Sequence, residues 1–347
     1  MNRKKWITLV ISVSFTLISF VGFTNYLVDP LWSFSHSNIF NKKQRYFDER
    51  QQKTNKLYFS GFDKYDSILI GSSRTATINQ NDFVNMNLYN YSSNALTPSE
   101  YKGYINFAKE LHKKDLKRII IGADFFGSFT IKEKQIKEPT FYINNSKSSF
   151  YRYKMLFSKN AFLNSIKNIK LAIKTNRSYY DRDNIKYYPK VSENKRIATM
   201  DKNIKTRLYE FESNTYDINY KSYLEELKTE NNNTKFTIYT PPISAKLLVS
   251  LLSNKDLMKQ HERWLKEIIS VFGEVHHFMS INSITSDLQN YPDAEHYYPY
   301  IGKLIGNKIS GVKNSDIPND FGIILNKNNI DNYINNLKIE VQKYDYK

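Results

Sequence analysis

The chain has 347 residues, a formal net charge of +17 and no cysteine. About 40% of its residues are hydrophobic, which is enough to form the core of one large domain or two small ones. The lack of cysteine excludes a disulfide scaffold, a thiolate metal site and a cysteine nucleophile.

An uncharged apolar run extends from residue 6 to residue 27, directly after Arg3, Lys4 and Lys5. A helix that crosses a bilayer needs about 20 such residues, and short basic flanks stay in the cytoplasm. A cleaved signal peptide is the alternative, but its apolar region would be shorter and no small-x-small site follows here. We therefore expect residues 1–29 to be a cytoplasmic stub and a single-pass anchor in a bacterial cell membrane, with the remainder extracytoplasmic.

Residues 30–62 form a polar connector, after which apolar segments alternate between two periodicities. Runs with strand character lie at 66–70, 86–91, 118–122, 236–239 and 274–278, and helical spacing recurs over 98–113, 217–230, 246–271 and 297–311. This alternation predicts a three-layer α/β/α domain with a mainly parallel five-stranded sheet over residues 63–312. Residues 313–347 are expected to be a polar tail.

A basic insert interrupts the alternation at about residues 130–215. Residues 131–200 alone hold 16 Lys or Arg against 5 Asp or Glu. Within the insert, one predicted helix face carries Phe162, Ile166, Ile169 and Ile173, and another carries Lys167, Lys170 and Lys174. Anionic lipid, an anionic surface polymer or plain solvent would suit this charge, and most such helices pack on their own domain. An extracytoplasmic location argues against nucleic acid.

The string Gly71-Ser72-Ser73-Arg74 directly follows the first predicted strand. A serine at the carboxyl end of a buried strand lies where a nucleophile is needed, and a following helix N-terminus would favour a developing anion. Gly-Ser-Ser alone is common in loops, so the strand before it carries the prediction. Ser73 is the predicted nucleophile, with Ser72 as the alternative.

The second string, Asp293-Ala294-Glu295-His296, lies near the C-terminal end of the predicted domain. A neutral imidazole at His296 would accept the Ser73 proton, and Asp293 would orient the ring and stabilise the imidazolium. A surface or structural histidine is the competing interpretation. We predict no metal site, because the neighbouring strand residues His276 and His277 point to opposite faces, and we predict no cofactor.

Four short segments, which we call blocks, follow one another along the chain: Gly71-Ser72-Ser73, the loop after the second predicted strand, Gly122-Ala123-Asp124 and Asp293-x-x-His296. In this order they resemble the sequence blocks of the SGNH (GDSL-type) hydrolase superfamily. The closest likeness is to membrane-anchored members of teichoic acid D-alanylation and alginate O-acetylation pathways, to which Asn25-Tyr26-x-x-Asp29-Pro30 is also similar. The resemblance implies Ser73 as nucleophile and Asp293 and His296 as its triad partners. It also implies oxyanion donors from the Ser73 backbone N–H, a second-block glycine and a third-block asparagine.

The sequence departs from that pattern at the last two donors. Ser92 stands at the glycine position, where a backbone N–H still serves, and Asp124 stands near the asparagine position. An ionised carboxylate accepts hydrogen bonds and does not donate to an oxyanion. Three outcomes remain open: Asn94 takes the role, Asp124 is protonated or turned away, or the activity is weak. Arg74 either supplies a cation beside the site or ties down the loop.

The predicted function is that of a serine esterase or O-acyltransferase acting on acyl esters of a cell-surface polysaccharide through an acyl-serine intermediate. A transferase would need a multispanning partner to bring the acyl group across the membrane. The alternative is a non-catalytic protein of the same fold that binds an anionic glycan or an assembly partner.

Overall fold

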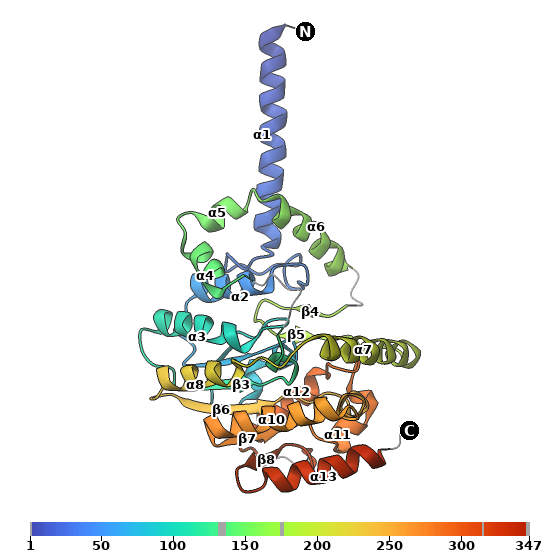
Figure 1. Cartoon of the computed structure of the whole chain (residues 1–347). Coiled ribbons are helices and arrows are strands. Elements are labelled where there is room, and N and C mark those ends of the chain that lie inside the picture. The colour runs from blue at the N-terminus through green and yellow to red at the C-terminus, as the bar shows by residue number, and fades with distance from the viewer. Residues whose placement is uncertain (1, 131–136, 174–176, 314–315, 345–347) are drawn as a thin grey trace. The chain divides into compact units, whose positions relative to one another are not determined.

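The computed structural model describes residues 2–130, 137–173, 177–313 and 316–344, so Lys174 lies outside the described residues (Figure 1). The chain divides into two compact units. The first unit combines Met1–Phe62 with Pro139–Pro189, and the second unit combines Asp63–Glu138 with Lys190–Lys347.

The first unit begins with the long apolar helix α1 (Arg3–Val28), whose first twenty residues are mostly exposed (Figure 1). Among the described residues, α1 is the one helix long and apolar enough to cross a membrane. It ends at Asp29, which adopts a left-handed conformation before Pro30. The Asp29 carboxylate accepts the Ser33 and Phe34 N–H groups and pairs with Arg182 at 3.0 Å. The end of the helix is thereby fixed to its own unit.

The other elements of the first unit surround the end of α1. They are α2 (Glu49–Ser60), α4 (Pro139–Lys147), α5 (Tyr151–Met155), α6 (Lys159–Ile173) and the short antiparallel pair β4 (Tyr179–Tyr180) and β5 (Lys186–Tyr187). Asn25 on α1 donates to the carbonyls of Leu156 and Ser158 and accepts the Ser165 hydroxyl. The segment between α5 and α6 is therefore bonded directly to α1.

The second unit is built on a six-stranded sheet in the order β2-β1-β3-β6-β7-β8. The strands are β1 (Ser67–Gly71), β2 (Leu88–Asn90), β3 (Arg118–Gly122), β6 (Lys235–Thr240), β7 (Glu274–His277) and β8 (Ile323–Asn326). The first five pair in parallel, as predicted, and β8 pairs antiparallel with β7. The prediction of five strands was wrong because β8 adds an edge strand from the segment expected to be a polar tail.

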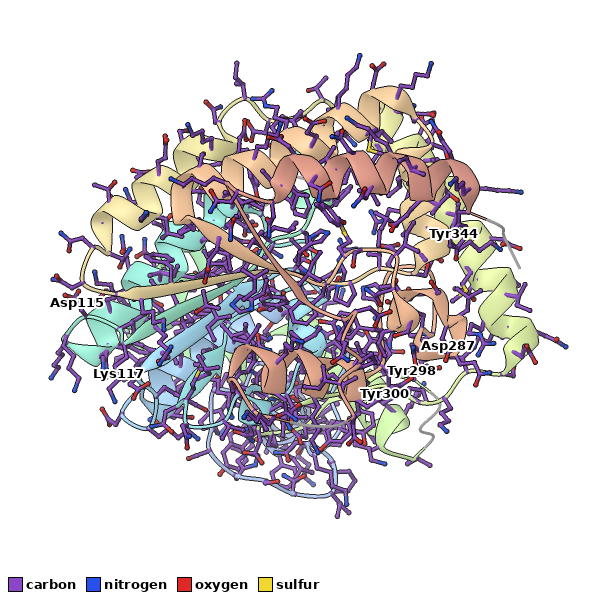
Figure 2. All side chains as sticks on the ribbon, turned by 90° about the horizontal axis from the view of Figure 1, so that it is seen from below. Asp115, Lys117, Asp287, Tyr298, Tyr300 and Tyr344 are labelled. Carbon is purple, nitrogen blue, oxygen red and sulfur yellow. The ribbon has the colours of Figure 1, made fainter. Side chains whose placement is uncertain are left out.

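Helices cover both faces of this sheet. The α-helices described in the second unit are α3 (Pro98–His112), α7 (Glu193–Ser213), α8 (Tyr220–Glu230), α9 (Ala245–Leu252), α10 (Lys255–Phe272), α11 (Ser283–Ser286), α12 (Pro299–Ile309) and α13 (Ile330–Lys343). In Figure 2, α8 and α10 lie on one side of the sheet, and α12, which begins beside Tyr298 and Tyr300, lies on the other. The single helix predicted over 246–271 is two helices, because Asn254 accepts the Asp256 and Leu257 N–H groups and starts a new one.

The units also divide the chain differently from the predicted segments. The connector 30–62 contains α2 and belongs to the first unit together with residues 139–189 of the predicted insert. The remainder of that insert contains α7, which belongs to the second unit. The predicted tail 313–347 supplies β8 and α13, whose apolar side chains Ile334 and Leu337 are buried.

Candidate active site

Ser73 lies just beyond the carboxyl end of β1, in a turn that leads into the short 3₁₀ helix η1 (Thr75–Thr77). Its side chain is half-buried, and its carbonyl accepts the Thr77 hydroxyl at 3.1 Å. The chain becomes extended again at Ile78. The predicted helix N-terminus behind the nucleophile is therefore wrong, because a single 3₁₀ turn has no substantial dipole.

Two strand-end glycines allow this turn to fold back over the sheet. Gly71 and Gly122 are direct neighbours in the β1–β3 pairing. A Cβ on Gly122 would lie 1.9 Å from the Thr75 hydroxyl oxygen, and one on Gly71 would lie 2.4 Å from it. The Thr75 hydroxyl accepts from the Tyr239 hydroxyl at 2.9 Å. The turn that carries Ser73 is therefore seated on the sheet by a contact that only glycine permits at both positions.

His296 reaches Ser73 across 223 positions of sequence. The distance from Ser73 Oγ to His296 Nε2 is 2.9 Å, which is hydrogen-bond distance. On the other side of the ring, His296 Nδ1 lies 3.0 Å from Asp293 Oδ2 and 3.2 Å from Oδ1. The predicted meeting of these three side chains is present in the structure.

Asp293 also accepts two backbone hydrogen bonds, from the N–H groups of Glu295 and His296, both at 2.8 Å to Oδ1. Burial disfavours the charged form of this carboxyl. The His296 charge, its ring hydrogen bond and the two backbone donors outweigh burial and lower the pKa of Asp293 to about 2. Asp293 is thus an ionised acceptor at neutral pH, which fixes the proton of a neutral His296 ring on Nδ1 and makes Nε2 the acceptor for the Ser73 hydroxyl.

The loop that carries Asp293 and His296 is anchored on both sides. Ser244, at the start of α9, donates from its N–H and its hydroxyl to the Ala294 carbonyl at 3.1 and 3.0 Å. The buried Tyr297 hydroxyl donates to the Arg74 carbonyl at 2.8 Å, so the residue after His296 is bonded to the residue after Ser73. Beyond it, the rings of Tyr298 and Tyr300 stack at 6.2 Å close to Asp287 (Figure 2).

Glu295 is a buried carboxylate between the two predicted triad residues. Arg207 on α7 binds its Oε2 at 2.6 Å, and Asn203, one turn earlier on α7, donates to its Oε1 at 3.0 Å. Burial opposes the charge, but Arg207 outweighs it and lowers the pKa of Glu295. The contacts of Arg207 and Asn203 with Glu295 were not predicted, because nothing local distinguishes Arg207 from the many basic residues of the predicted insert.

Arg74 and Asp124 form a buried ion pair beside Ser73. Arg74 Nε donates to Asp124 Oδ1, and Arg74 Nη1 lies 3.9 Å from Glu295 Oε2. The second Asp124 oxygen, Oδ2, is buried without a hydrogen-bond partner in the part of the chain that the structure describes. Of the two predictions for Arg74, the structure therefore favours the one in which it ties the loop, and Asp124 is held by that pair.

The structure gives the predicted oxyanion donors different surroundings. Ser92 is fully buried, and its N–H donates to Asn90 Oδ1 at 3.1 Å, so the prediction that it faces an oxyanion was wrong. The side-chain NH₂ group of Asn90 donates to the Thr75 and Ile78 carbonyls. The end of β2 is therefore hydrogen-bonded to the turn that follows Ser73. Asn94 is exposed on the loop after β2. Among the described residues, the Ser73 N–H donates to no protein acceptor.

Of the two strand histidines, His277 has a hydrogen-bond partner at each ring nitrogen. His277 is fully buried between the Thr240 hydroxyl, 2.9 Å from Nδ1, and the Tyr333 hydroxyl, 2.7 Å from Nε2. Burial lowers the pKa of His277 well below its usual value. Within the described residues no group of three or more His, Asp or Glu side chains is placed to hold a metal ion.

Comparison of the chain with protein-family models, with curated proteins and with solved structures finds no match. The chemical interpretation of the site therefore depends on its own geometry.

Proposed function

We propose that this protein is a serine esterase or O-acyltransferase of the SGNH type, anchored in a membrane and acting on acyl esters of a cell-surface polysaccharide. One observation carries the proposal: Ser73 Oγ lies 2.9 Å from His296 Nε2, while His296 Nδ1 lies 3.0 Å from Asp293. A nucleophile, a base and an orienting carboxylate in this order are the arrangement that acyl transfer through serine requires.

In the proposed reaction, Ser73 Oγ attacks the ester carbonyl carbon as its proton moves to His296 Nε2. The Ser73 N–H, which has no acceptor among the described residues, is the available backbone donor toward the developing oxyanion. Collapse of the tetrahedral intermediate breaks the bond to the alcohol, which leaves with the proton from His296. Water or a glycan hydroxyl then attacks the acyl-Ser73 carbonyl by the same route in reverse.

The anchoring part of the proposal is supported by α1, whose length and composition suit a membrane span. The three basic residues Arg3, Lys4 and Lys5 favour a cytoplasmic N-terminus, which would place both units outside the cytoplasm. We propose cell-surface glycans as the acyl acceptors in that compartment. If the acyl donor is cytoplasmic, a multispanning partner must pass the acyl group across the membrane.

The decisive experiment is hydrolysis of an aryl acetate by the full chain in detergent, together with labelling by a fluorophosphonate probe. We expect Ser73→Ala and His296→Ala each to lower kcat by about a thousandfold or more, and Ser73→Ala to abolish labelling. The matched control is Ser72→Ala, which removes the neighbouring hydroxyl and should leave both readouts in place. A wild-type chain that neither turns over substrate nor takes up the probe would support the non-catalytic glycan-binding alternative.

A further inference from the structure

Helix α6 buries mainly small and polar side chains and leaves most of its large apolar side chains partly or fully exposed. Ala161, Ser165, Asn168 and Leu171 are the buried positions. Asn168 accepts the Arg45 and Tyr46 N–H groups, so this face is committed to the first unit by hydrogen bonds. The apolar stripe predicted from the sequence is only partly covered, and its last member, Ile173, is 78% exposed. A soluble helix normally does the opposite.

The open face of α6 continues onto the segment before it. Phe150 and Phe157 in that segment are 73% and 58% exposed, and Leu163 on α6 is 47% exposed. We use the term collar for α5 and α6 with the flanking residues Phe150 and Phe157. A cluster of exposed aromatic and aliphatic side chains of this kind marks a surface that something apolar covers.

The anchor helix places the collar at a defined depth. Twenty residues of helix span about 30 Å, the thickness of a bilayer's hydrocarbon core. Counted from Trp6, that length of α1 ends at Asn25, which bonds to the Leu156 and Ser158 carbonyls of the collar. The rings of Phe20 and Phe162 also meet edge to face at 6.1 Å. If α1 spans a membrane, the collar lies at the boundary between hydrocarbon and head groups.

The charge of the collar region has one sign. Residues 139–173 contain six basic and no acidic side chains. Lys154, Lys159, Lys167 and Lys170 are all exposed. Basic side chains flanking exposed aromatic ones are the composition of segments that lie in the interface of an anionic bilayer.

We propose that the collar is a membrane-interface element that seats the first unit on an anionic lipid surface around the exit of α1. The apolar side chains enter the upper acyl region and the lysines meet lipid phosphates. This inference rests on the anchoring part of the proposed function and is independent of the triad. It explains why Leu163 and Ile173 of α6 are left exposed, since the bilayer supplies the covering that the unit does not.

The test uses the absence of cysteine in the chain. Phe150→Cys and Phe157→Cys, each labelled with an environment-sensitive fluorophore, are placed in full-length protein in vesicles of equal phosphatidylcholine and phosphatidylglycerol. We expect nitroxides on shallow acyl positions to quench both labels about threefold more than a label at Ile218→Cys. Ile218 is 80% exposed in the second unit and is the matched apolar control.

A charge-reversed collar, Lys159→Glu with Lys167→Glu and Lys170→Glu, should lose most of this quenching, as should the wild type at high salt. The same reversal on α7, at Lys195, Lys202 and Lys205, is the control and should leave quenching unchanged. Quenching at the collar no greater than at Ile218 overturns the proposal. So does label burial that depends on protein concentration and not on anionic lipid, because a second copy would then be the occupant.

Two separate readouts show which part has failed. Extraction of the chain from vesicles by alkaline carbonate would refute the anchor and with it the collar. Loss of collar quenching with anchoring and aryl acetate hydrolysis intact would refute the collar alone.

Discussion

The substitution Asp293→Asn tests the site most sharply, because it changes one atom and keeps the size of the side chain. Asp293 Oδ1 accepts two backbone N–H groups at 2.8 Å, so the amide oxygen of an asparagine will keep that position. Its NH₂ group must then occupy the Oδ2 position, 3.0 Å from His296 Nδ1. The asparagine NH₂ group then donates toward His296 Nδ1, which itself carried the proton and donated to Asp293 in the wild type.

The consequence is a change of tautomer at His296. With a donor opposite Nδ1, that nitrogen becomes the acceptor and the proton of the neutral ring moves to Nε2. Nε2–H then faces Ser73 Oγ at 2.9 Å and does not accept its proton. Loss of the base in this way lowers kcat by about four orders of magnitude in serine proteases, or about 5 kcal/mol of transition-state stabilisation. We expect a similar loss here, with KM little changed.

The assay is aryl acetate hydrolysis by the full chain in detergent at a pH of about 7.5, with kcat and KM measured separately. Asp201→Asn, which makes the same chemical change at an exposed surface ion pair with Lys246, is the control and should keep wild-type kcat. A variant with asparagine at 293 that retains more than about a tenth of wild-type kcat would refute the tautomer argument, since that is under 1.4 kcal/mol.

Three further predictions concern stability and positioning. Tyr297→Phe strands the Arg74 carbonyl that its hydroxyl binds at 2.8 Å, and should cost about 1–3 kcal/mol in chemical denaturation. Arg207→Met removes the 2.6 Å partner of buried Glu295, so unfolding should become easier by about 3 kcal/mol and Arg207→Lys should restore part of it. Because folding lowers the pKa of Asp293 from 3.8 to about 2, the stability that it contributes is full above pH 3.8 and disappears as the pH falls toward 2. Acid titration of unfolding should show a loss of about 2 kcal/mol that Asp293→Asn lacks.

The parts of the fold that the sequence revealed are those with a strong local pattern. The strands β1 and β3 stand out in the sequence as buried apolar runs, and the carboxyl ends of the predicted parallel strands indicated that Ser73 and the 293–296 loop would meet. The strand β8 was missed because its four residues lie in an Asn- and Lys-rich segment, where pairing with β7 decides the structure and local composition does not.

The supporting contacts of the site had no such local pattern. Arg207 and Glu295 meet through the packing of α7 against the site loop, and one arginine among many gives no signal in sequence. Ser92 was placed by its position after a strand, but its N–H is captured by Asn90 two residues earlier. Side-chain acceptors of that kind compete for backbone donors in turns, and the outcome depends on exact loop geometry.

The role of Asp124 is best understood together with Arg74. Arg74 is only about a tenth exposed, and a guanidinium that deep in a fold needs an anion. Asp124 supplies it directly, and Glu295 lies near enough at 3.9 Å to share the charge. A neutral asparagine at 124 would leave that guanidinium with the more distant carboxylate, which Arg207 already binds at 2.6 Å. Asp124 and Arg74 therefore act as one buried ion pair. It follows that Arg74 and Asp124 must be replaced together, as Arg74→Met with Asp124→Asn, to ask whether this pair supports catalysis or only the turn.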